Sequence, residues 1–430
     1  MSLGSGARRF LRQLGWSFTS KIVSAALQLV VIVLLARGLE PSRFAGVASA
    51  NAVMMGVVAL NGFGLIRQIQ YRRSVDPDDP ALPAIFAVWQ RFTNASAVLW
   101  LVGCLVLWAV TGHDLYAQLT PVAVWLLFEQ LTTVWNGISL VDERAHDLMP
   151  SYLWRRGPVV VALAVALAAD LDVVWTWSLA LAAGSVLAYL TGLGRAVPWA
   201  RRIVVGRRPA GEVTFDFGYW WTEVGATLRD LDVAAVTLVS AATGGAYALP
   251  ARLVRPMNLV TVAVTSVAFP RIARLRQVTQ RQLLLGSVVG TLPVACVAGV
   301  TAVAAGLLPR LVGHEYAGAV PVLRVLCLNA VVVGFGGLLV TFMQARSSEA
   351  NRFTGRLALV TAVGQVSSAA IAASVGDAVA AAWAVTAVLA AGVALLYARA
   401  AHECRLEALN GGRAAPPAPA QPRTPPDPSE

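Results

Sequence analysis

Long apolar segments, repeated along almost the whole chain, restrict the possible folds of this sequence more than any other feature. Many run for eighteen residues or more, which as a helix is enough to cross a hydrocarbon core of about 30 Å. Charged residues make up only 13% of the chain, about half of the roughly 25% that is typical of soluble domains. The sequence therefore predicts an integral membrane protein built from helices.

The apolar windows and the polar breaks between them predict twelve membrane spans. The first begins at Trp16, after three arginines, and is longer than the apolar part of a cleavable signal peptide, about 7 to 15 residues. The predicted spans are 16–36, 44–65, 84–111, 116–140, 153–170, 174–198, 217–241, 246–269, 283–308, 318–343, 353–375 and 377–399.

The arginines are distributed unequally between alternate loops, and this predicts the orientation. If the N-terminus is cytoplasmic, the outside loops hold only Arg37, Arg43 and Arg310. The inside loops then hold the basic clusters Arg67, Arg72, Arg73; Arg144, Arg155, Arg156; Arg201, Arg202, Arg207, Arg208; Arg271, Arg274, Arg276, Arg281; and Arg346, Arg352, Arg356. Because cytoplasmic loops are enriched in basic residues, both termini are expected in the cytoplasm of a bacterial cell, with the chain in its plasma membrane.

Two parts of the sequence resemble each other, and this predicts two six-span lobes. ARGLEPSRFAGVASA, from Ala36, corresponds to SAATGGAYALPARLV, from Ser240; in each, a helix ends and Phe44 or Tyr247 opens the next one. An even number of spans in each lobe places the expected pseudo-twofold axis along the membrane normal. The expected parts are a basic N-terminus (1–15), an N-lobe (16–200), a cytoplasmic linker (201–216), a C-lobe (217–400) and a disordered, Pro-rich cytoplasmic tail (401–430).

Charged side chains within the spans are candidate functional residues, because each costs about 2.5 to 3.5 kcal/mol at the centre of a membrane helix. In the first span Lys21 and Gln28 share a helical face, which either lines a wet interior or lets Lys21 reach the headgroups. The seventh span carries Glu223 and Asp230 on one face.

The eighth span carries Arg252, Arg255 and Asn258. Arg255 is predicted about 14 Å from the outer end of its span and Asp230 about 20 Å from the inner end of its own, so the two can meet. They form either a structural ion pair or a site where an anionic substrate replaces Asp230.

Glu129 is the charged residue of the fourth span, on a polar face with Asn136. It is either the partner of a cavity arginine or a proton site.

Motifs for catalysis or cofactor binding are missing from the sequence. It contains no GxxxxGK[ST], HExxH or GxSxG pattern, and its four cysteines have no CxxC spacing. Apart from Lys21 every basic residue is arginine, and no Lys-rich tail is available to grip nucleic acid. We therefore expect neither an enzyme nor a nucleic-acid binder, and no metal or cofactor.

Three sequence blocks resemble a known family. ARGLEPSRFAGVASANAVMMGVVALNGFGLIRQIQYRRS is similar to the first block of the polysaccharide (O-antigen, Wzx-type) flippases of the multidrug/oligosaccharidyl-lipid/polysaccharide exporter superfamily. The second block, LRDLDVAAVTLVSAATGGAYALPARLVRPMNLVTVAVTSVAFPRIARL, resembles the start of that family's second half. The third, LLPRLVGHEYAGAVPVLRVLCLNA, resembles its G..y..a...l..l segment. The matching residues are Asp232, Gly245, Tyr247 and Pro270 in the second block, and Gly313, Tyr316 and Ala319 in the third.

The resemblance implies a MATE-like transporter of about twelve helices that flips an undecaprenyl-diphosphate-linked oligosaccharide to the outer leaflet by alternating access. It also implies a cavity lined by cations, for which Lys21, Arg252 and Arg255 are the candidates by position. A polysaccharide polymerase or glycan-assembly enzymes are expected partners. Two alternatives stay open: a multidrug cation antiporter on the same fold, using Glu129, Glu223 or Asp230, and a membrane scaffold acting through the Pro-rich tail.

Overall fold

The computed structural model describes residues 5–76, 79, 81–205, 217–262, 264–265, 272, 278–344, 346 and 348–409, and every element in them is helical. The α-helices are α1 (Ser5–Arg37), α2 (Pro41–Gly62), α3 (Leu65–Val75), α4 (Leu82–Thr111), α5 (Asp114–Gln118), α6 (Val122–Val141), α7 (Leu148–Ala168), α8 (Val173–Val205), α9 (Phe217–Leu228), α10 (Asp232–Val239), α11 (Ala241–Val254), α13 (Gln280–Ala304), α14 (Leu308–Val312), α15 (Ala319–Gln344), α16 (Ser348–Val375) and α17 (Ala378–Leu409). Short 3-10 turns join several of them, including η1 (Ala145–Asp147), η2 (Arg229–Leu231), η3 (Arg255–Met257), η4 (Ala305–Leu307) and η5 (His314–Tyr316).

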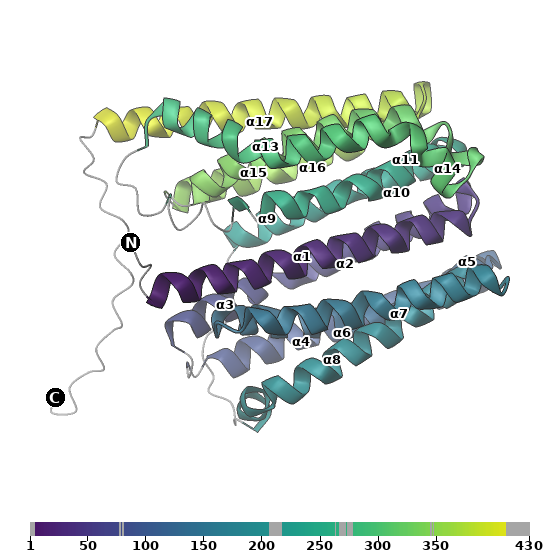
Figure 1. Ribbon diagram of the computed structural model, residues 1–430, viewed down its shortest axis with the longest axis horizontal. Helices are drawn as coiled ribbons and strands as arrows, with labels where there is room; N and C mark the ends of the chain where they lie inside the picture. The colour runs from purple at the N-terminus through teal and green to yellow at the C-terminus, as the bar shows by residue number, and fades with distance from the viewer. Residues whose placement is uncertain are drawn as a thin grey trace.

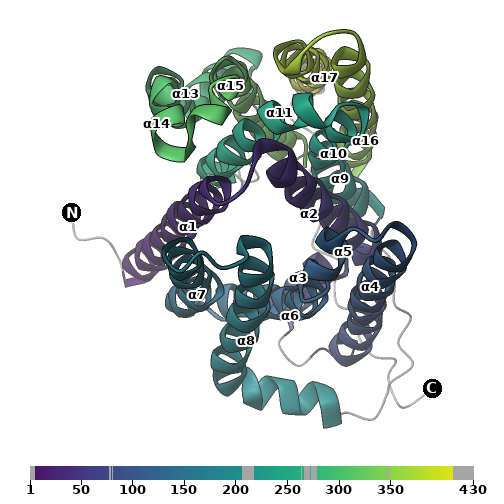
Figure 2. The ribbon, with the colours of Figure 1, turned by 90° about the vertical axis from the view of Figure 1, so that its right-hand side faces the viewer.

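The long helices run side by side as one bundle (Figure 1). We call the end where α1 begins and α17 finishes the termini end, and the end with the α1–α2 turn, α5 and α14 the turn end. Viewed from the turn end, α1–α8 and α9–α17 form two groups that meet along α1 and α2 (Figure 2). We refer to these groups as the first and second halves.

Eight segments are long and apolar enough to cross a membrane by length and composition. They are Gly15–Arg37, Pro41–Leu60, Leu82–Thr111, Val173–Gly192, Gln280–Val312, Ala319–Gln344, Glu349–Val375 and Ala378–Leu406. The other four predicted spans coincide with α6, α7, α9–α10 and α11 with the residues after it, which lie in the same bundle. Helices α9, α10 and α11 are each too short to cross a membrane alone, because 3-10 turns interrupt their spans. Helices α6 and α7 carry charged residues such as Glu129 and Arg155, which reduce the apolar character of a span. The all-helical membrane fold predicted from the sequence is confirmed.

Several predicted spans are interrupted. The seventh divides into α9 and α10 around the turn at Arg229–Leu231, and the eighth breaks at Arg255–Met257. Pro256 lies in the second break, and proline has no N–H to donate to the preceding helical turn. The predicted fourth span begins too early, because Pro121 separates α5 from α6.

Three expected boundaries differ from the structure. Helix α1 begins at Ser5, inside the predicted N-terminal segment 1–15, and α8 continues through Val205 into the predicted linker 201–216. Residues 401–409 of the predicted disordered tail are helical and form the last turns of α17, where Ala401 and Cys404 are buried. The remainder of the linker (206–216), the remainder of the tail (410–430) and Pro270 lie outside the described residues.

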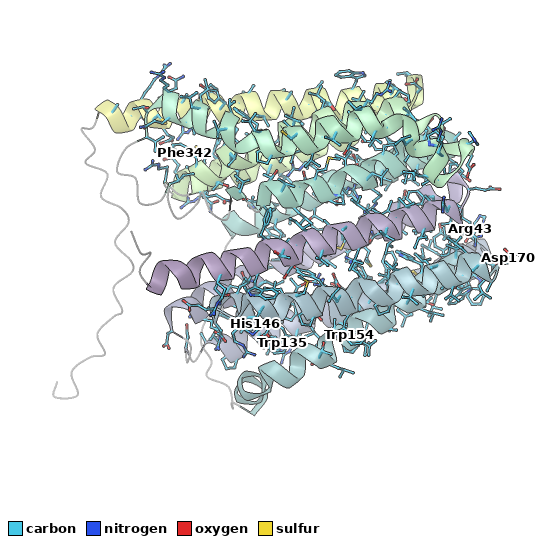
Figure 3. The ribbon with its side chains drawn as sticks, in the orientation of Figure 1. Arg43, Trp135, His146, Trp154, Asp170 and Phe342 are labelled. Atoms are coloured by element: carbon cyan, nitrogen blue, oxygen red, sulfur yellow. The ribbon has the colours of Figure 1, made fainter. Side chains whose placement is uncertain are left out.

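Arginine side chains separate along the bundle as the loop pattern predicted. Arg37, Arg43 and Arg310 belong to the turn end, where Figure 3 shows Arg43 and Asp170. The clusters that contain Arg73 and Arg346 lie at the termini end, on the side of Phe342. Five other arginines of the predicted inside clusters lie outside the described residues: Arg207, Arg208, Arg271, Arg274 and Arg276. Arg155 and Arg156 are corrected from a loop position, because α7 begins at Leu148 and both lie inside the helix.

The two halves pack closely at the turn end. Tyr316 is buried and its hydroxyl donates a 2.9 Å hydrogen bond to the carbonyl oxygen of Leu39 in the α1–α2 turn. The ring of Phe44 meets Tyr316 edge to face at 6.4 Å between centroids. A Cβ on Gly245 would lie 2.8 Å from Pro41 Cβ, so α11 approaches α2 where only glycine fits. Phe44 and Tyr247, the paired aromatics of the internal repeat, are both buried in the core that the halves share.

Candidate functional site

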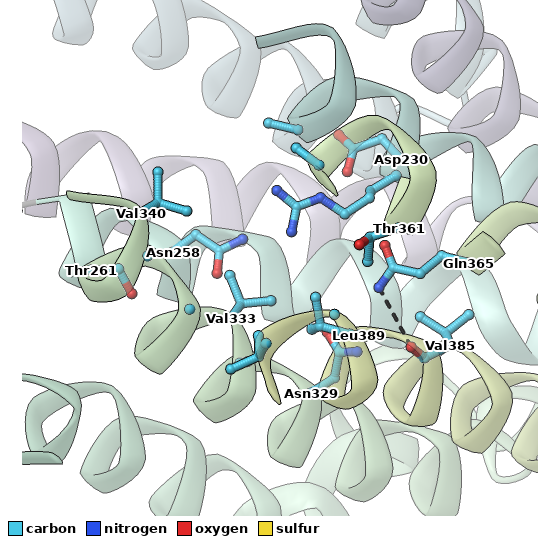
Figure 4. A pocket seen from close by; sticks show the side chains of 18 of the residues that line it. Asp230, Asn258, Thr261, Asn329, Val333, Val340, Thr361, Gln365, Val385 and Leu389 are labelled. Atoms are coloured by element: carbon cyan, nitrogen blue, oxygen red, sulfur yellow. Dashed lines mark hydrogen bonds between the residues drawn. The ribbon is translucent and has the colours of Figure 1, made fainter. Parts of the chain in front are cut away.

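A cavity of about 390 Å³ lies inside the second half, between α9, α11, α15, α16 and α17. All of its lining residues come from residues 222–396, so the second half alone forms it. Figure 4 shows Asp230, Asn258, Thr361 and Gln365 around the same space. The cavity therefore combines polar groups from helices that are distant in the sequence.

Arg255 is the central charged group of the cavity and connects two acids. Its Nε lies 3.0 Å from Asp230 Oδ1, and its Nη2 lies 3.4 Å from Asp232 Oδ1. The predicted contact between Arg255 and Asp230 is confirmed as a short ion pair. Asp232 also accepts a 2.7 Å hydrogen bond from the Tyr247 hydroxyl and a 2.6 Å hydrogen bond from the Val233 N–H. Tyr247 thus fixes the acid that holds one side of Arg255.

Several polar atoms around the cavity are buried and lack a hydrogen-bond partner among the described residues. They comprise two donors on arginine, two amide acceptors and one hydroxyl: Arg255 Nη1, Arg229 Nε, Asn258 Oδ1, Gln365 Oε1 and Thr261 Oγ1. Gln365 is held in place because its Nε2 donates a 3.4 Å hydrogen bond to the Val385 carbonyl (Figure 4). Buried polar groups are normally paired, so a set of unpaired ones facing one space indicates a ligand or ordered water.

Arg255, Asp230 and Asn258 are the predicted site residues that line this cavity. Glu223 does not line it, and its side chain is exposed. The cavity face of α9 follows Thr222 and Ala226, one residue before the face predicted from Glu223.

The remaining predicted cations lie elsewhere. Arg252 donates to the carbonyl oxygen of Ala48 in α2, which places it between the halves. Lys21 and Gln28 lie on α1, partly exposed, and neither is a lining residue of the described cavity. Of the three predicted cavity cations, only Arg255 is therefore a lining residue of the described cavity.

Glu129 belongs to a second buried charge cluster, in the first half. It is 8% exposed and accepts two hydrogen bonds from Arg155, one of them 2.7 Å from Nε to Oε2. Arg156 Nη2 lies 3.9 Å from the same carboxylate. The partner of Glu129 is thus an arginine of α7 and not one of the predicted cavity arginines. Sequence reasoning missed this pair because Arg155 stands near a predicted span end, where arginine normally reaches water.

A polar network caps the turn end of the first half. Asp172 Oδ1 accepts hydrogen bonds of 2.9 Å from the N–H groups of Val174 and Trp175 at the start of α8. Asp172 Oδ2 lies 3.2 Å from Arg43 Nη2. Partial burial tends to raise the pKa of Asp172, but the backbone N–H groups and Arg43 outweigh it and hold the pKa below its usual value.

Most of the cavity residues were not selected as sites from the sequence, among them the polar residues Arg229, Asp232, Thr261 and Gln365. Gln365 lies in a stripe of neutral polar residues, which more often packs helices than binds ligands. Arg229 and Asp232 were recognisable as charges within a span. Their role depends on η2, which no helical periodicity predicts.

No protein-family model matches the chain. It is 26% identical over 345 residues to the "Succinoglycan biosynthesis transport protein ExoT" of Rhizobium meliloti (strain 1021), covering 75% of this chain and 66% of that protein. The chain thus spans slightly less than two thirds of this relative.

The fold matches solved transporters over nearly its whole length. An inward-facing MATE family transporter of the MOP superfamily superposes with a TM-score of 0.64 at 16% identity, covering 91% of this chain and 96% of that one. The lipid II flippase MurJ in an inward closed conformation superposes with a TM-score of 0.62 at 11% identity, covering 91% of both chains. The chain therefore shares the all-helical, multi-pass fold of these MATE and MurJ structures. Its relative in Rhizobium meliloti is named a transport protein, and the two solved structures are a transporter and a flippase.

Proposed function

We propose that this protein is a membrane transporter of the multidrug/oligosaccharidyl-lipid/polysaccharide exporter superfamily that flips an undecaprenyl-diphosphate-linked oligosaccharide from the cytoplasmic to the outer leaflet of the bacterial plasma membrane. It acts by alternating access, and the termini end faces the cytoplasm. The name of the succinoglycan transport relative supports a role in cell-surface polysaccharide synthesis, and MurJ supports a lipid-linked cargo on this fold.

The observation that carries this proposal is the unpaired nitrogen of Arg255. Nε and Nη2 are held by Asp230 and Asp232, while Nη1 is buried without a partner among the described residues. A guanidinium presents its donors in a planar fork that fits two oxygens of a phosphate. A cargo diphosphate that binds Nη1 can then displace Asp230, which is the more exposed of the two acids at 34% of its side chain.

The neutral polar atoms of the cavity support a cargo that carries sugars. Asn258 Oδ1 and Gln365 Oε1 accept hydrogen bonds, and Thr261 Oγ1 can either donate or accept. Sugar hydroxyls offer both donors and acceptors and can satisfy all three. A cationic drug would need a free carboxylate, but both acids of the described cavity already contact Arg255, and Arg229 in the same lining supplies the second positive charge. The charge arrangement therefore favours the lipid-linked oligosaccharide over the cation antiporter.

The test replaces Arg255 and follows lipid-linked oligosaccharide in cells that depend on this transporter. Arg255→Ala should leave the cargo in the inner leaflet, and Arg255→Lys should restore flipping only in part, because a point charge lacks the bidentate fork. Arg91→Ala, at an exposed arginine of α4, is the matched control and should flip normally.

The double variant Arg255→Ala with Asp230→Ala separates binding from folding. Recovered expression without flipping would support the binding role. Recovered flipping would contradict it, because the arginine would then serve only to balance Asp230. In a strain that lacks the protein, lost export of a cationic drug with unchanged lipid-linked oligosaccharide would favour the antiporter. In the same strain, unchanged drug export and unchanged oligosaccharide flipping would favour the scaffold.

A further inference from the structure

An apolar groove of about 540 Å³ lies on the outer surface of the second half, close to the cavity. Helices α13 and α17 pack on either side of α15, and α15 forms the floor between them (Figure 2). Leu284, Val288 and Leu292 of α13 form one wall, and their side chains are more than 40% exposed. The groove is thus open along the surface that faces lipid.

The groove occupies the termini-end part of the bundle. On α13 it extends from Leu284, near the start of the helix, to Ala295. This stretch rises about 17 Å, roughly half of the hydrocarbon thickness of about 30 Å. At the termini end Tyr397 lines the groove, and its hydroxyl lies 3.4 Å from Gln280 Nε2. The groove therefore covers one leaflet and has a polar pair at its headgroup end.

Only a thin wall separates the groove from the polar cavity. Val393 of α17 lines both spaces, and Gly336 of α15 lines the cavity directly opposite it. A Cβ on Gly336 would lie 2.8 Å from Val393 Cγ2, so the two helices touch there without a second side chain between them. The wall is one side chain thick because Gly336 has none.

We propose that the groove binds the polyprenyl chain of the cargo while its diphosphate occupies the cavity. This inference rests on the proposed function. A polyprenyl diphosphate is charged at one end and apolar along the rest, and the structure places a cavity with an unpaired arginine donor and an apolar groove on opposite sides of one seam. Gly336 and Val393 mark the place where the two spaces lie closest together. Selectivity over phospholipid comes from packing and from the tethered headgroup, because the bilayer interior is as apolar as the groove.

Photolabelling of the purified transporter in lipid nanodiscs tests this proposal. The probes are undecaprenyl phosphate and phosphatidylglycerol, each with a diazirine in the chain, and adducts are mapped by mass spectrometry. The measured quantity is the labelling by the prenyl probe divided by the labelling by the phosphatidylglycerol probe. This ratio should be at least about threefold higher at residues 284–295 and 390–397 than on the exposed face of α16 around Val360 and Ile371, because the prenyl headgroup tethers the chain. The same labelling ratio on both faces would overturn the proposal.

A matched pair of variants tests the groove itself. Ala394→Phe fills it, whereas Leu395→Phe changes the next residue on α17, which is 59% exposed and does not line the groove. Ala394→Phe should abolish the prenyl enrichment and slow flipping, and Leu395→Phe should change neither. Enrichment that persists in Ala394→Phe would refute the groove as the chain site. Loss of flipping and reduced prenyl enrichment in Arg255→Ala, together with enrichment that is lost in Ala394→Phe but kept in Leu395→Phe, would support both proposals. Normal flipping in Arg255→Ala would contradict the cavity proposal alone.

Discussion

Replacing Glu129 with glutamine tests whether one carboxylate holds together the buried charge cluster of the first half. Arg155 donates two hydrogen bonds to Glu129, and Arg156 Nη2 lies 3.9 Å from Glu129 Oε1. The arginine side chains are 9% and 19% exposed. Glutamine keeps the size of the side chain but removes the charge that faces both arginines.

The structure predicts that removing the carboxylate of Glu129 lowers the free energy of unfolding more than removing the guanidinium of Arg155. Removing one partner of a buried ion pair costs about 3–5 kcal/mol, and Glu129→Gln should fall in this range because it leaves two neighbouring cations. Arg155→Met should cost less, about 1.5–3 kcal/mol for a lost charged hydrogen bond, because Arg156 is close enough to take over the carboxylate. Arg155→Lys keeps the charge but not the fork and should cost least.

The measurement is unfolding of the purified variants in mixed micelles with rising SDS, followed by tryptophan fluorescence. An Arg155→Met variant that is as unstable as Glu129→Gln, or less stable, would refute the sharing of one carboxylate by two arginines. Flipping is measured on the same variants. We expect Glu129→Gln to insert but to transport poorly, and normal transport by a well-expressed variant would limit Glu129 to packing.

Three further predictions concern the turn end and the orientation. Tyr316→Phe removes the hydrogen bond to Leu39, which is worth about 1 kcal/mol. The population of molecules whose halves are separated at the turn end should therefore rise about fivefold, as measured by spin-label distances across that end. An unchanged distance distribution would contradict this prediction. The lowered pKa of Asp172 stabilises the fold above the ordinary aspartate pKa of about 3.9, and this contribution is lost as the pH falls through the lowered value. The melting-temperature difference between wild type and Asp172→Asn should therefore shrink at acid pH, and a constant difference would count against this sign. A reporter active only outside the cytoplasm should be on after Asp114 and off after Arg207, and the opposite pattern would reverse the loading side.

The sequence by itself determined the class of fold and the position of nearly every helix. Apolar runs and arginine-rich breaks are local properties, and the hydrocarbon thickness converts them directly into spans. The ion pair of Arg255 with Asp230 was also predictable, because the two residues lie on consecutive spans at similar depth. The family blocks indicated Asp232, Tyr247 and Tyr316 as distinctive positions, although not their contacts.

Only the tertiary structure decided which buried charges meet and where the cavity lies. Arg155 contacts Glu129 because α7 begins earlier than its apolar run, and Arg252 reaches α2 because the halves pack there. Glu223 lies outside the cavity lining, whereas Thr222 and Ala226 of the same helix belong to it. Gln365 and Asp230 lie on helices far apart in the sequence and line one cavity only after the helices pack. Hydropathy measures the preference of each segment for lipid, whereas these contacts depend on rotation and packing between segments, which no single segment encodes.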